Sequence, residues 1–442
     1  MKPESETYTA FRWKRWHLPA AVAFFVVAVG LYLWVLRTHL PEMWVMIDLA
    51  VYRWGGLTTW HHATASQLYT GAYQGFLPFI YPPFAAEIFS GLAHFSMPRL
   101  EQMVWTVSLV SLFASTWISW GILGMARNRQ RVVATLAVGA FALWLEPVQQ
   151  TLAFGQVNLV LMLLTLGDLA LSDRRWYKGV GIGLAAGFKL TPAIFIVYLA
   201  MTRRFRAALV STAVLVATVA AGYAFLPSQA KQYWDGGFMV GSKVGQSYLA
   251  NQSISGELYR LVAQQDVTPI WAPIAVVVAV AGLILAAHYS KLGRELEGIL
   301  VCAGTMLLVS PISWTHHYVW VVPALVFFTD AVLRIRRHWA WTYFAAGLAL
   351  FFAWMMQLNG QGNNDPIAAY VPTGLIWYVP HRGPEDQWGF LESIAGNYYS
   401  ILVAVLLVCA GVYYWRRLRT PAEPPAPAET EPVTELVEAE SV

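Results

Sequence analysis

Six short polar stretches interrupt an otherwise apolar sequence, and their side chains could bind or activate a substrate. The first contains Asp48, Tyr52 and Arg53. A carboxylate among apolar neighbours can serve as a general base, with a pKa set by partial burial and by the adjacent arginine. Asp48 could equally be the acidic first residue of a helix or a structural partner of Arg53. The second stretch holds Tyr81 followed by two prolines, which fix the start of a helix and need no catalytic role.

The third and fifth stretches are rich in carboxamides. Four amides and one carboxylate follow an apolar run: Glu146, Gln149, Gln150, Gln156 and Asn158. Such a set suits recognition of several hydroxyl groups, and helix capping would account for only one or two of its members. The fifth stretch contributes Asn251 and Gln252, which could instead form a turn.

The fourth and sixth stretches supply nitrogen groups. Lys189 is a lone cation at the break of an apolar helical hairpin, where it could neutralise a lipid-linked phosphate or extend to the membrane surface. Trp314, His316 and His317 lie between two apolar runs. The histidines could hydrogen-bond a phosphate or a sugar, and the aromatic rings could stack on a sugar. Neighbouring residues point about 100° apart on a helix, and no HExxH or DxD pattern occurs, so the sequence favours no metal site.

Several common catalytic signatures do not occur in the sequence. It has no glycine-rich phosphate loop, no serine nucleophile elbow and no nucleotide-binding motif. A nucleotide sugar or ATP is therefore not expected as the direct donor, and an enzyme of this kind would take its activated group from a lipid carrier. The two cysteines, Cys302 and Cys409, lie in apolar runs and predict neither a disulfide framework nor a thiolate metal site.

The elements that position these stretches must be membrane-spanning helices. Of the 442 residues, 57% are hydrophobic and only 12% are charged, about half the charged fraction of a soluble globular protein. Since a span needs about 20 apolar residues, the composition predicts an all-α, polytopic integral membrane protein with about twelve transmembrane helices. The net charge is only +4, and a helical membrane bundle offers no basic face, so nucleic acid is excluded as a partner.

Lysine and arginine predict the topology, because short cytoplasmic loops carry an excess of both. Basic clusters occur at residues 2–15, 127–131, 174–178, 203–206, 291–294, 334–337 and 416–419. If all are cytoplasmic, both termini are cytoplasmic and the six polar stretches face outwards. The predicted hairpins pair 17–37 with 102–125, 132–148 with 156–172, 206–226 with 271–288, 295–311 with 317–334, and 338–357 with 396–415. Two shortened helices meet around Lys189, and the apolar run at 82–97 must be an outward-facing interfacial helix.

Taken together, the six stretches resemble the GT-C class of membrane glycosyltransferases, and within it glycosyltransferase family 87. The similarity rests on Asp48-Leu-Ala-Val-Tyr52, Phe79-Ile-Tyr-Pro-Pro-Phe84, Gly155-Gln-Val-Asn-Leu159, Gly187-Phe-Lys-Leu-Thr-Pro192, Asn251-Gln-Ser253 and Ser313-Trp-Thr-His-His317. The resemblance implies a GT-C fold and an inverting α-(1→2)-mannosyltransferase on the outer face of the plasma membrane. It implies polyprenyl-phosphate mannose as donor and a phosphatidylinositol mannoside glycolipid as acceptor.

The resemblance also implies residue roles. Asp48 is the expected catalytic base, and Lys189, His316 and His317 are expected to bind the donor phosphate. Substrate contacts are expected from Tyr52, Arg53, Tyr81, Glu146, Gln156, Asn158, Asn251, Gln252 and Trp314. Neither a cofactor nor a metal ion is expected.

The predicted organisation has three parts. Residues 1–16 form a cytoplasmic N-terminus, residues 17–415 form the transmembrane catalytic domain, and residues 416–442 form a cytoplasmic tail. The tail is acidic and rich in Pro and Glu, so we expect it to be disordered. Outer loops are expected at 38–101, 227–270 and 358–395, the first of them containing the interfacial helix at 82–97.

Two alternative functions stay open. Another polyprenyl-phosphate-sugar transferase, acting in lipomannan or lipoarabinomannan branching, would share the catalytic aspartate and differ in its acceptor. A lipid flippase or transporter would belong to a different class of protein. Transporters tend to have repeated halves and charges near the middle of the membrane, and the sequence has no internal repeat and few such charges.

Overall fold

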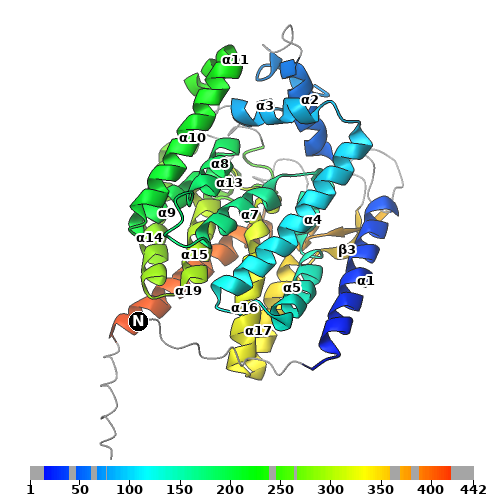
Figure 1. Cartoon of the computed structure of the whole chain (residues 1–442), viewed down its shortest axis with the longest axis vertical. Coiled ribbons are helices and arrows are strands. Elements are labelled where there is room, and N and C mark those ends of the chain that lie inside the picture. Colours follow the sequence, from blue (N-terminus) through cyan, green and yellow to red (C-terminus); the bar gives the residue numbers. More distant parts are fainter. Residues whose placement is uncertain are drawn as a thin grey trace, which may run out of the picture.

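The computed structural model describes residues 14–38, 46–60, 67–75, 77–237, 245–262, 266–358, 369–379 and 388–419. Within these ranges the protein is helical apart from two short antiparallel hairpins (Figure 1). The all-α class predicted from the sequence is confirmed. Most of the predicted N-terminal segment, and the predicted tail beyond Arg419, lie outside the described residues.

Among the described residues, six helices are long and apolar enough to cross a membrane. They are α1 (His17–Thr38), α4 (Met97–Ile122), α10 (Phe205–Phe225), α14 (Thr268–Lys291), α16 (Val321–Ile335) with the preceding turn η5 (Thr315–Trp320), and α19 (Tyr398–Arg419). A seventh span results if α6 (Glu146–Phe154) and α7 (Asn158–Leu169) count as one broken helix, whose axis bends by 117° at the break. The chain is therefore a polytopic membrane protein.

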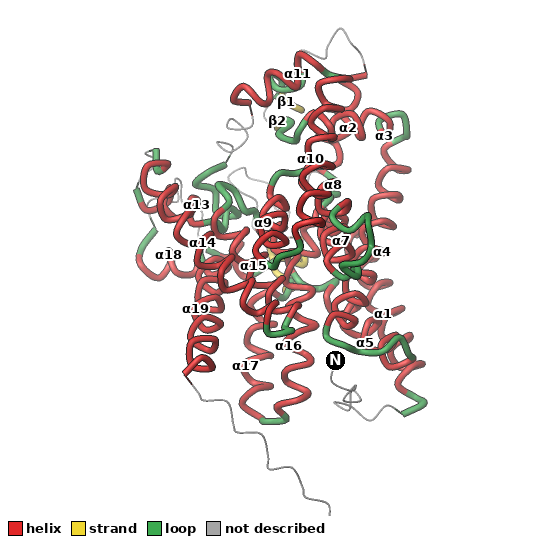
Figure 2. The backbone as a smooth tube through the Cα atoms, turned by 60° about the vertical axis from the view of Figure 1, so that its left-hand side comes forward, coloured by secondary structure: helices red, strands yellow, loops and turns green. Residues whose placement is uncertain are grey.

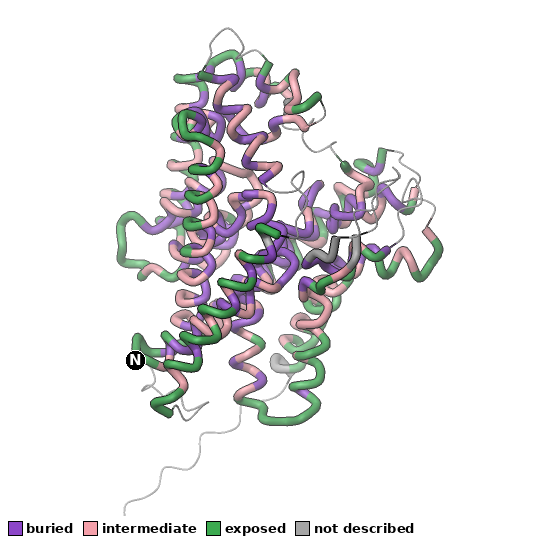
Figure 3. Tube along the Cα trace, turned by 90° about the vertical axis from the view of Figure 1, so that its right-hand side faces the viewer, coloured by how far each residue is buried: buried purple, intermediate pink, exposed green. Residues whose placement is uncertain are grey.

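The outer surfaces of these helices are apolar. Val27, Val216, Val277 and Val408 lie on α1, α10, α14 and α19, and all four are exposed. Figure 3 shows exposed residues along the outside of the bundle and buried residues gathered within it. An apolar surface of this extent is unfavourable in water and suits the hydrocarbon layer of a membrane.

The other helices of the bundle are shorter. They are α5 (Arg129–Ala142), α8 (Val180–Phe188), α9 (Ile194–Met201), α15 (Glu295–Val309) and α17 (His338–Phe351), with the turn η3 (Thr191–Ala193) between α8 and α9. A span needs about 20 residues, and the longest of these helices, α15, has 15. The sequence predicts about twelve spans because it counts such segments, whereas length and composition of the described helices give six or seven.

One end of the bundle carries several short elements. They are α2 (Ile47–Trp60), the strands β1 (Ala72–Tyr73) and β2 (Leu77–Pro78), α3 (Pro83–Leu92), α11 (Pro227–Gln232) and η4 (Tyr233–Gly237). Figures 1 and 2 both place α2, α3 and α11 together at this end. The helix predicted at 82–97 ends earlier, at Leu92, because the chain turns and a new helix begins at Met97 with Pro98 in its first turn. With ten residues, α3 is too short to span a membrane.

The loop predicted at 358–395 contains regular structure in its described parts. Strand β3 (Trp354–Leu358) pairs with β4 (Ala369–Thr373), and Trp354 lies opposite Thr373. The turn η6 (Leu375–Tyr378) and helix α18 (Phe390–Gly396) follow, and α13 (Ile254–Leu261) lies near α18 in Figure 2. These elements cover the bundle close to the site described below.

Candidate active site

A cavity of about 690 Å³ opens among α2, the break between α6 and α7, the break between α8 and α9, and the turn η5. Its volume lies within the range of small-molecule sites. Eight residues singled out in the sequence line it: Asp48, Tyr52, Tyr81, Gln156, Lys189, Trp314, His316 and His317. The fold therefore brings together five of the six polar stretches in one place.

Asp48 is half-buried in the first turn of α2. The backbone N–H of Met46 donates to the carbonyl of Ala153 at 2.6 Å, which connects the start of α2 to the end of α6. Gly155 ends α6 with a φ of 71°, and a Cβ atom at this position would lie 2.7 Å from the Cβ atom of Leu49. Glycine is therefore required for the α6–α7 break to pack directly against α2.

Gln156 connects the candidate base to two tyrosines. Its Nε2 atom donates to Oδ2 of Asp48 at 2.8 Å. Its Oε1 atom accepts from the hydroxyls of Tyr52 at 2.7 Å and Tyr81 at 3.1 Å. Since hydroxyl groups surround the amide oxygen, the N–H₂ group of Gln156 is oriented towards Asp48.

The surroundings of Asp48 suit a general base. Burial raises the pKa of Asp48 to about 6, although the hydrogen bond from Gln156 and the positive charge of Lys189 oppose this shift. The carboxylate is then ionised at neutral pH and is a stronger base than an exposed aspartate. Arg53 points elsewhere, since its Nε atom donates to the carbonyl of Phe95 at 3.3 Å and its side chain does not line the cavity.

Lys189 points into the same cavity. Helix α8 ends at Phe188, and Lys189 has an extended backbone conformation before the turn that contains Pro192. Its Nζ atom donates to Oδ1 of Asn158 at 3.1 Å and lies 2.8 Å from Nε2 of His317. The sequence left open that Lys189 extends to the membrane surface, and these contacts place its ammonium group inside the protein instead.

His316 presents an unpartnered nitrogen at the cavity. Its carbonyl accepts hydrogen bonds from Oγ1 of Thr151 at 3.1 Å and Nδ2 of Asn158 at 3.0 Å, which fix the backbone of η5. Its buried Nε2 atom has no hydrogen-bond partner within the described ranges. Because buried polar atoms are normally paired, this atom is available to a bound substrate. No group of three His, Cys, Asp or Glu side chains among the described residues could hold a metal ion, and the metal-free reaction stays a prediction.

Two of the predicted substrate contacts join backbone segments near the cavity without lining it. Oδ1 of Asn251 accepts from the backbone N–H of Ser313 at 2.9 Å, and Nε2 of Gln252 donates to the carbonyls of Leu249 and Gly396 at 2.7 Å each. Both carboxamides are fully buried. Their contact with substrate stays a prediction, while the structure gives them a role in holding this segment against α18 and the start of η5.

Glu146 and Asn158 also lie outside the cavity lining. Asn158 acts through its hydrogen bonds to Lys189 and to the backbone of His316. Glu146 is fully buried, and its carboxylate accepts from Nε1 of Trp377 at 3.0 Å and from the hydroxyl of Tyr399 at 2.6 Å. Both side chains therefore hold residues that do line the cavity or flank it.

Sequence reasoning did not single out several aromatic residues of the cavity. Tyr233, Tyr248, Tyr259, Trp271 and Trp377 all line it. They lie in the predicted outer loops or at the start of α14, where aromatic residues are common because the membrane surface favours them. The one sequence signal that could have indicated these five residues is their position in or next to the predicted loops.

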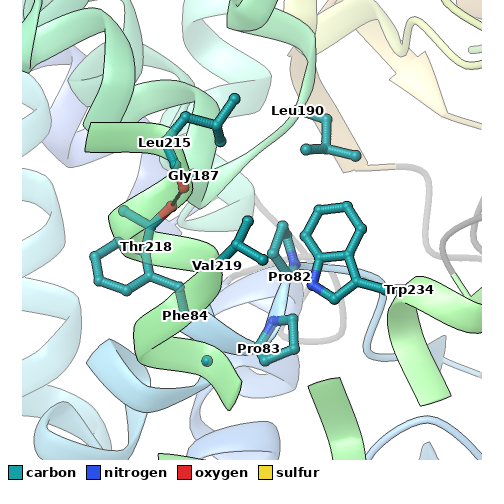
Figure 4. A pocket seen from close by; sticks show the side chains of 10 residues that line it. Pro82, Pro83, Phe84, Gly187, Leu190, Leu215, Thr218, Val219 and Trp234 are labelled. Atoms are coloured by element: carbon teal, nitrogen blue, oxygen red, sulfur yellow. Dashed lines mark hydrogen bonds between the residues drawn. The ribbon is translucent and has the colours of Figure 1, made fainter. Parts of the chain in front are cut away.

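A narrow apolar crevice adjoins the cavity, and it is too tight to hold a water molecule. Figure 4 shows its lining, which comes from the start of α3, the end of α8, helix α10 and the segment after α11: Pro82, Pro83, Phe84, Gly187, Leu190, Leu215, Thr218, Val219, Gly222 and Trp234. Pro82 and Leu190 line both the crevice and the cavity. Since Leu190 follows Lys189 in the chain, the crevice connects the surroundings of this cation to the candidate span α10.

Comparison with known proteins identifies related chains. The model of glycosyltransferase family 87 matches residues 79–311. The chain is 32% identical over 386 residues to a polyprenol-phosphate-mannose-dependent α-(1-2)-phosphatidylinositol mannoside mannosyltransferase of Mycobacterium tuberculosis, over 83% of this chain and 87% of that protein. It is 33% identical over 346 residues to the protein of the same name from Mycolicibacterium smegmatis, over 72% and 77%.

A further Mycobacterium tuberculosis relative is described as a polyprenol-phosphate-mannose-dependent α-(1-2)-phosphatidylinositol pentamannoside mannosyltransferase. It is 34% identical over 333 residues, which cover 73% of this chain and 76% of that protein. No solved structure matches the chain.

Proposed function

The chain belongs to glycosyltransferase family 87, and from this premise we propose that it transfers mannose from polyprenol-phosphate mannose to a phosphatidylinositol mannoside through an α-(1→2) linkage. The names of its relatives give this donor, acceptor class and linkage for those proteins. One observation carries the proposal: Asp48 and Lys189 line the same cavity, each hydrogen-bonded to its own amide side chain. Asp48 supplies a base for the acceptor hydroxyl, and Lys189 supplies a cation for the donor phosphate.

The proposed reaction is a single displacement. The acceptor hydroxyl attacks the anomeric carbon of mannose from the face opposite the phosphate, and Asp48 takes the hydroxyl proton. The bond between this carbon and the phosphate oxygen breaks, and polyprenyl phosphate leaves with the electron pair. Lys189, next to His316 and His317, stabilises the charge that develops on the phosphate. Attack from the opposite face inverts a β-linked donor to an α-linked product.

The polyprenyl tail of the donor needs an apolar path from the cavity to the membrane. The crevice of Figure 4 has an almost entirely apolar lining, begins beside Lys189 and ends at α10, whose outward surface is apolar. A phosphate bound at Lys189 would place the first isoprene units at Leu190 and Pro82. We assign the tail to this crevice, whose side chains must turn outwards to admit it, because its atoms leave little open width.

The proposed sidedness and cofactor requirement follow from the sequence. The reaction takes place on the outer face of the plasma membrane, since the basic clusters predict cytoplasmic loops at the other ends of the spans. Both termini are then cytoplasmic. The base and the phosphate cation are side chains of the protein itself, so the proposed reaction needs neither a metal ion nor an organic cofactor.

The test compares purified wild type, Asp48→Asn and Asp235→Asn in nanodiscs. Asp235 is an exposed carboxylate in η4 and does not line the cavity, so its replacement is the matched control. With labelled polyprenol-phosphate mannose and phosphatidylinositol mannosides, Asp48→Asn should lower the rate by about 10²- to 10⁴-fold, the usual contribution of a general base. Asp235→Asn should retain the wild-type rate.

Each other outcome excludes part of the proposal. A folded Asp48→Asn variant with the wild-type rate would show that Asp48 is not the base. Wild-type transfer only to a different glycolipid would keep the donor and replace the acceptor. Movement of the donor lipid across a vesicle membrane without any transfer would favour the transporter alternative.

A further inference from the structure

Three aromatic rings form a continuous surface on one part of the cavity. They are Tyr248, Trp314 and Trp377, called the aromatic wall below, and all three line the cavity. The ring centroids of Tyr248 and Trp314 are 6.0 Å apart, and those of Tyr248 and Trp377 are 6.2 Å apart. Rings at these separations are in contact, although the three residues come from distant parts of the sequence.

We propose that the aromatic wall binds the mannose units already present on the acceptor, and that Glu146 is the positioning residue that holds Trp377 in this wall. The inference rests on the proposed function, since it divides the same cavity between donor and acceptor. The donor sugar must lie between Lys189 and Asp48, because its phosphate needs the cation and its anomeric carbon must be reached by the hydroxyl that Asp48 deprotonates. This arrangement leaves the rest of the cavity lining, which includes the aromatic wall, for the acceptor.

The chemistry of the wall suits an uncharged sugar. A pyranose ring presents C–H groups on its faces, which pack on aromatic rings, and hydroxyl groups at its edges. The cavity also contains Gln246, Tyr259 and Ser255, whose polar atoms can reach such edges. The indole Nε1 atom of Trp271 is buried in the cavity lining without a hydrogen-bond partner in the described part of the chain, so it can donate to a sugar oxygen.

Glu146 is placed to fix the position of Trp377. Its carboxylate accepts from the indole N–H of Trp377 at 3.0 Å and from the hydroxyl of Tyr399 at 2.6 Å, which joins α6, η6 and α19. Gly374 begins the turn that carries Trp377, and a Cβ atom on it would lie 2.7 Å from Cγ of Glu146. The loop is therefore packed directly onto this carboxylate.

The ionisable group at position 146 needs an explanation. Glu146 has no exposed surface, and among the described residues its carboxylate forms no ion pair. Burying a carboxylate without a cation is costly, and hydrogen bonds are its only compensation here. A side chain kept at such a cost, hydrogen-bonded to one wall residue and not itself lining the cavity, is explained by the need to hold that residue.

The experiment measures KM for the acceptor and KM for the donor separately in four variants. Trp377→Ala removes the ring and should raise the acceptor KM about tenfold, as truncation of a buried aromatic contact residue does, while the donor KM stays within about twofold of wild type. Glu146→Ala should produce a similar change. Glu146→Gln keeps an oxygen for the indole N–H and should restore most of the acceptor affinity. Tyr378→Ala is the control, because Tyr378 is the exposed neighbour of Trp377 and does not line the cavity.

A double variant tests whether Glu146 acts through Trp377. The changes in acceptor KM for Glu146→Ala and Trp377→Ala should not multiply in the combined variant, because the second change removes what the first one positions. If Glu146→Ala does not fold, Trp377→Ala still tests whether the aromatic wall binds the acceptor, and Glu146→Gln still tests whether the side chain at position 146 holds Trp377. A donor KM that rises together with the acceptor KM, an unchanged acceptor KM in Trp377→Ala, or inactive Glu146→Gln would each overturn the inference. Wild type without any mannosyl transfer would refute the proposed function instead.

Discussion

Replacing Gln156 by Met should shift the pH dependence of the reaction. Gln156 donates a hydrogen bond to Oδ2 of Asp48 at 2.8 Å, and methionine has similar length without a donor. Burial raises the pKa of Asp48 to about 6, and this hydrogen bond limits the rise. A hydrogen bond to a charged group contributes about 1.5 to 3 kcal/mol, and one pKa unit corresponds to about 1.4 kcal/mol. Its loss should therefore raise the pKa of Asp48 by about one unit or somewhat more.

The assay is the initial rate of mannosyl transfer from pH 5 to 8.5 at low donor concentration. Protonated Asp48 cannot accept a proton, so the wild-type rate should fall as pH drops through about 6. Burial lowers the pKa of Lys189 to about 7, so the rate should also fall as pH rises above about 7 and the amine loses the charge that binds the donor phosphate. In Gln156→Met the fall on the acid side should begin about one pH unit higher. Tyr81→Phe is the control, because it removes a partner of Gln156 but not the hydrogen bond between Gln156 and Asp48.

Two results would refute this reasoning. A wild-type rate that does not change between pH 5 and 7 would mean that no group with the pKa of Asp48 must be ionised for transfer. The same midpoint in wild type and Gln156→Met would mean that the Gln156 hydrogen bond does not set the pKa of the base. Lower activity alone, with an unchanged midpoint, would count against the argument.

Four further predictions concern the donor, its tail, metal ions and topology. Lys189→Met should raise the donor KM about 30-fold or more, with little change in the acceptor KM, since it removes the cation from a buried polar site. Val219→Trp narrows the crevice and should raise the KM of a long-chain polyprenyl donor about tenfold, while a donor with two isoprene units keeps its wild-type KM. Treatment with a chelator should leave the rate unchanged, and a loss that added Mg²⁺ or Mn²⁺ restores would contradict the metal-free reaction. In a Cys409→Ser background, a membrane-impermeable maleimide should label exposed Ser96→Cys in intact cells and exposed Ala126→Cys only after lysis, and the reverse pattern would invert the topology.

The positions of Asp48 and Lys189 could be predicted because each is polar in an apolar surrounding. A charged residue next to a helix break in a membrane protein is costly unless it has a partner or a ligand. That rule identifies both residues from the sequence alone, and both line the cavity. The number of spans was harder to predict, since α15 and α17 are apolar but have only 15 and 14 residues.

The role of a buried carboxamide could not be predicted in the same way. An amide can hydrogen-bond a sugar or a backbone group equally well, and sequence does not say which is nearby. Asn251 and Gln252 bind backbone atoms, while Gln156 reaches Asp48. The bond between Glu146 and Trp377 joins residues 231 positions apart, and no local pattern in the sequence indicates such a pairing.

The break between α6 and α7 explains how one short motif can serve both ends of the proposed reaction. Gly155 lets the chain turn and pack against α2, and the helix axis bends by 117° at this break. The next residue, Gln156, donates a hydrogen bond to the proposed base Asp48, and Asn158 two positions later forms hydrogen bonds with Lys189 and the backbone of η5. Because both bonds start from the same turn, the proposed base and the cation are held relative to each other through the two peptide bonds between Gln156 and Asn158 rather than through separate loops. A displacement needs its proton acceptor and its leaving-group partner on opposite sides of one carbon atom, and a single break in a helix is a direct way to hold them there.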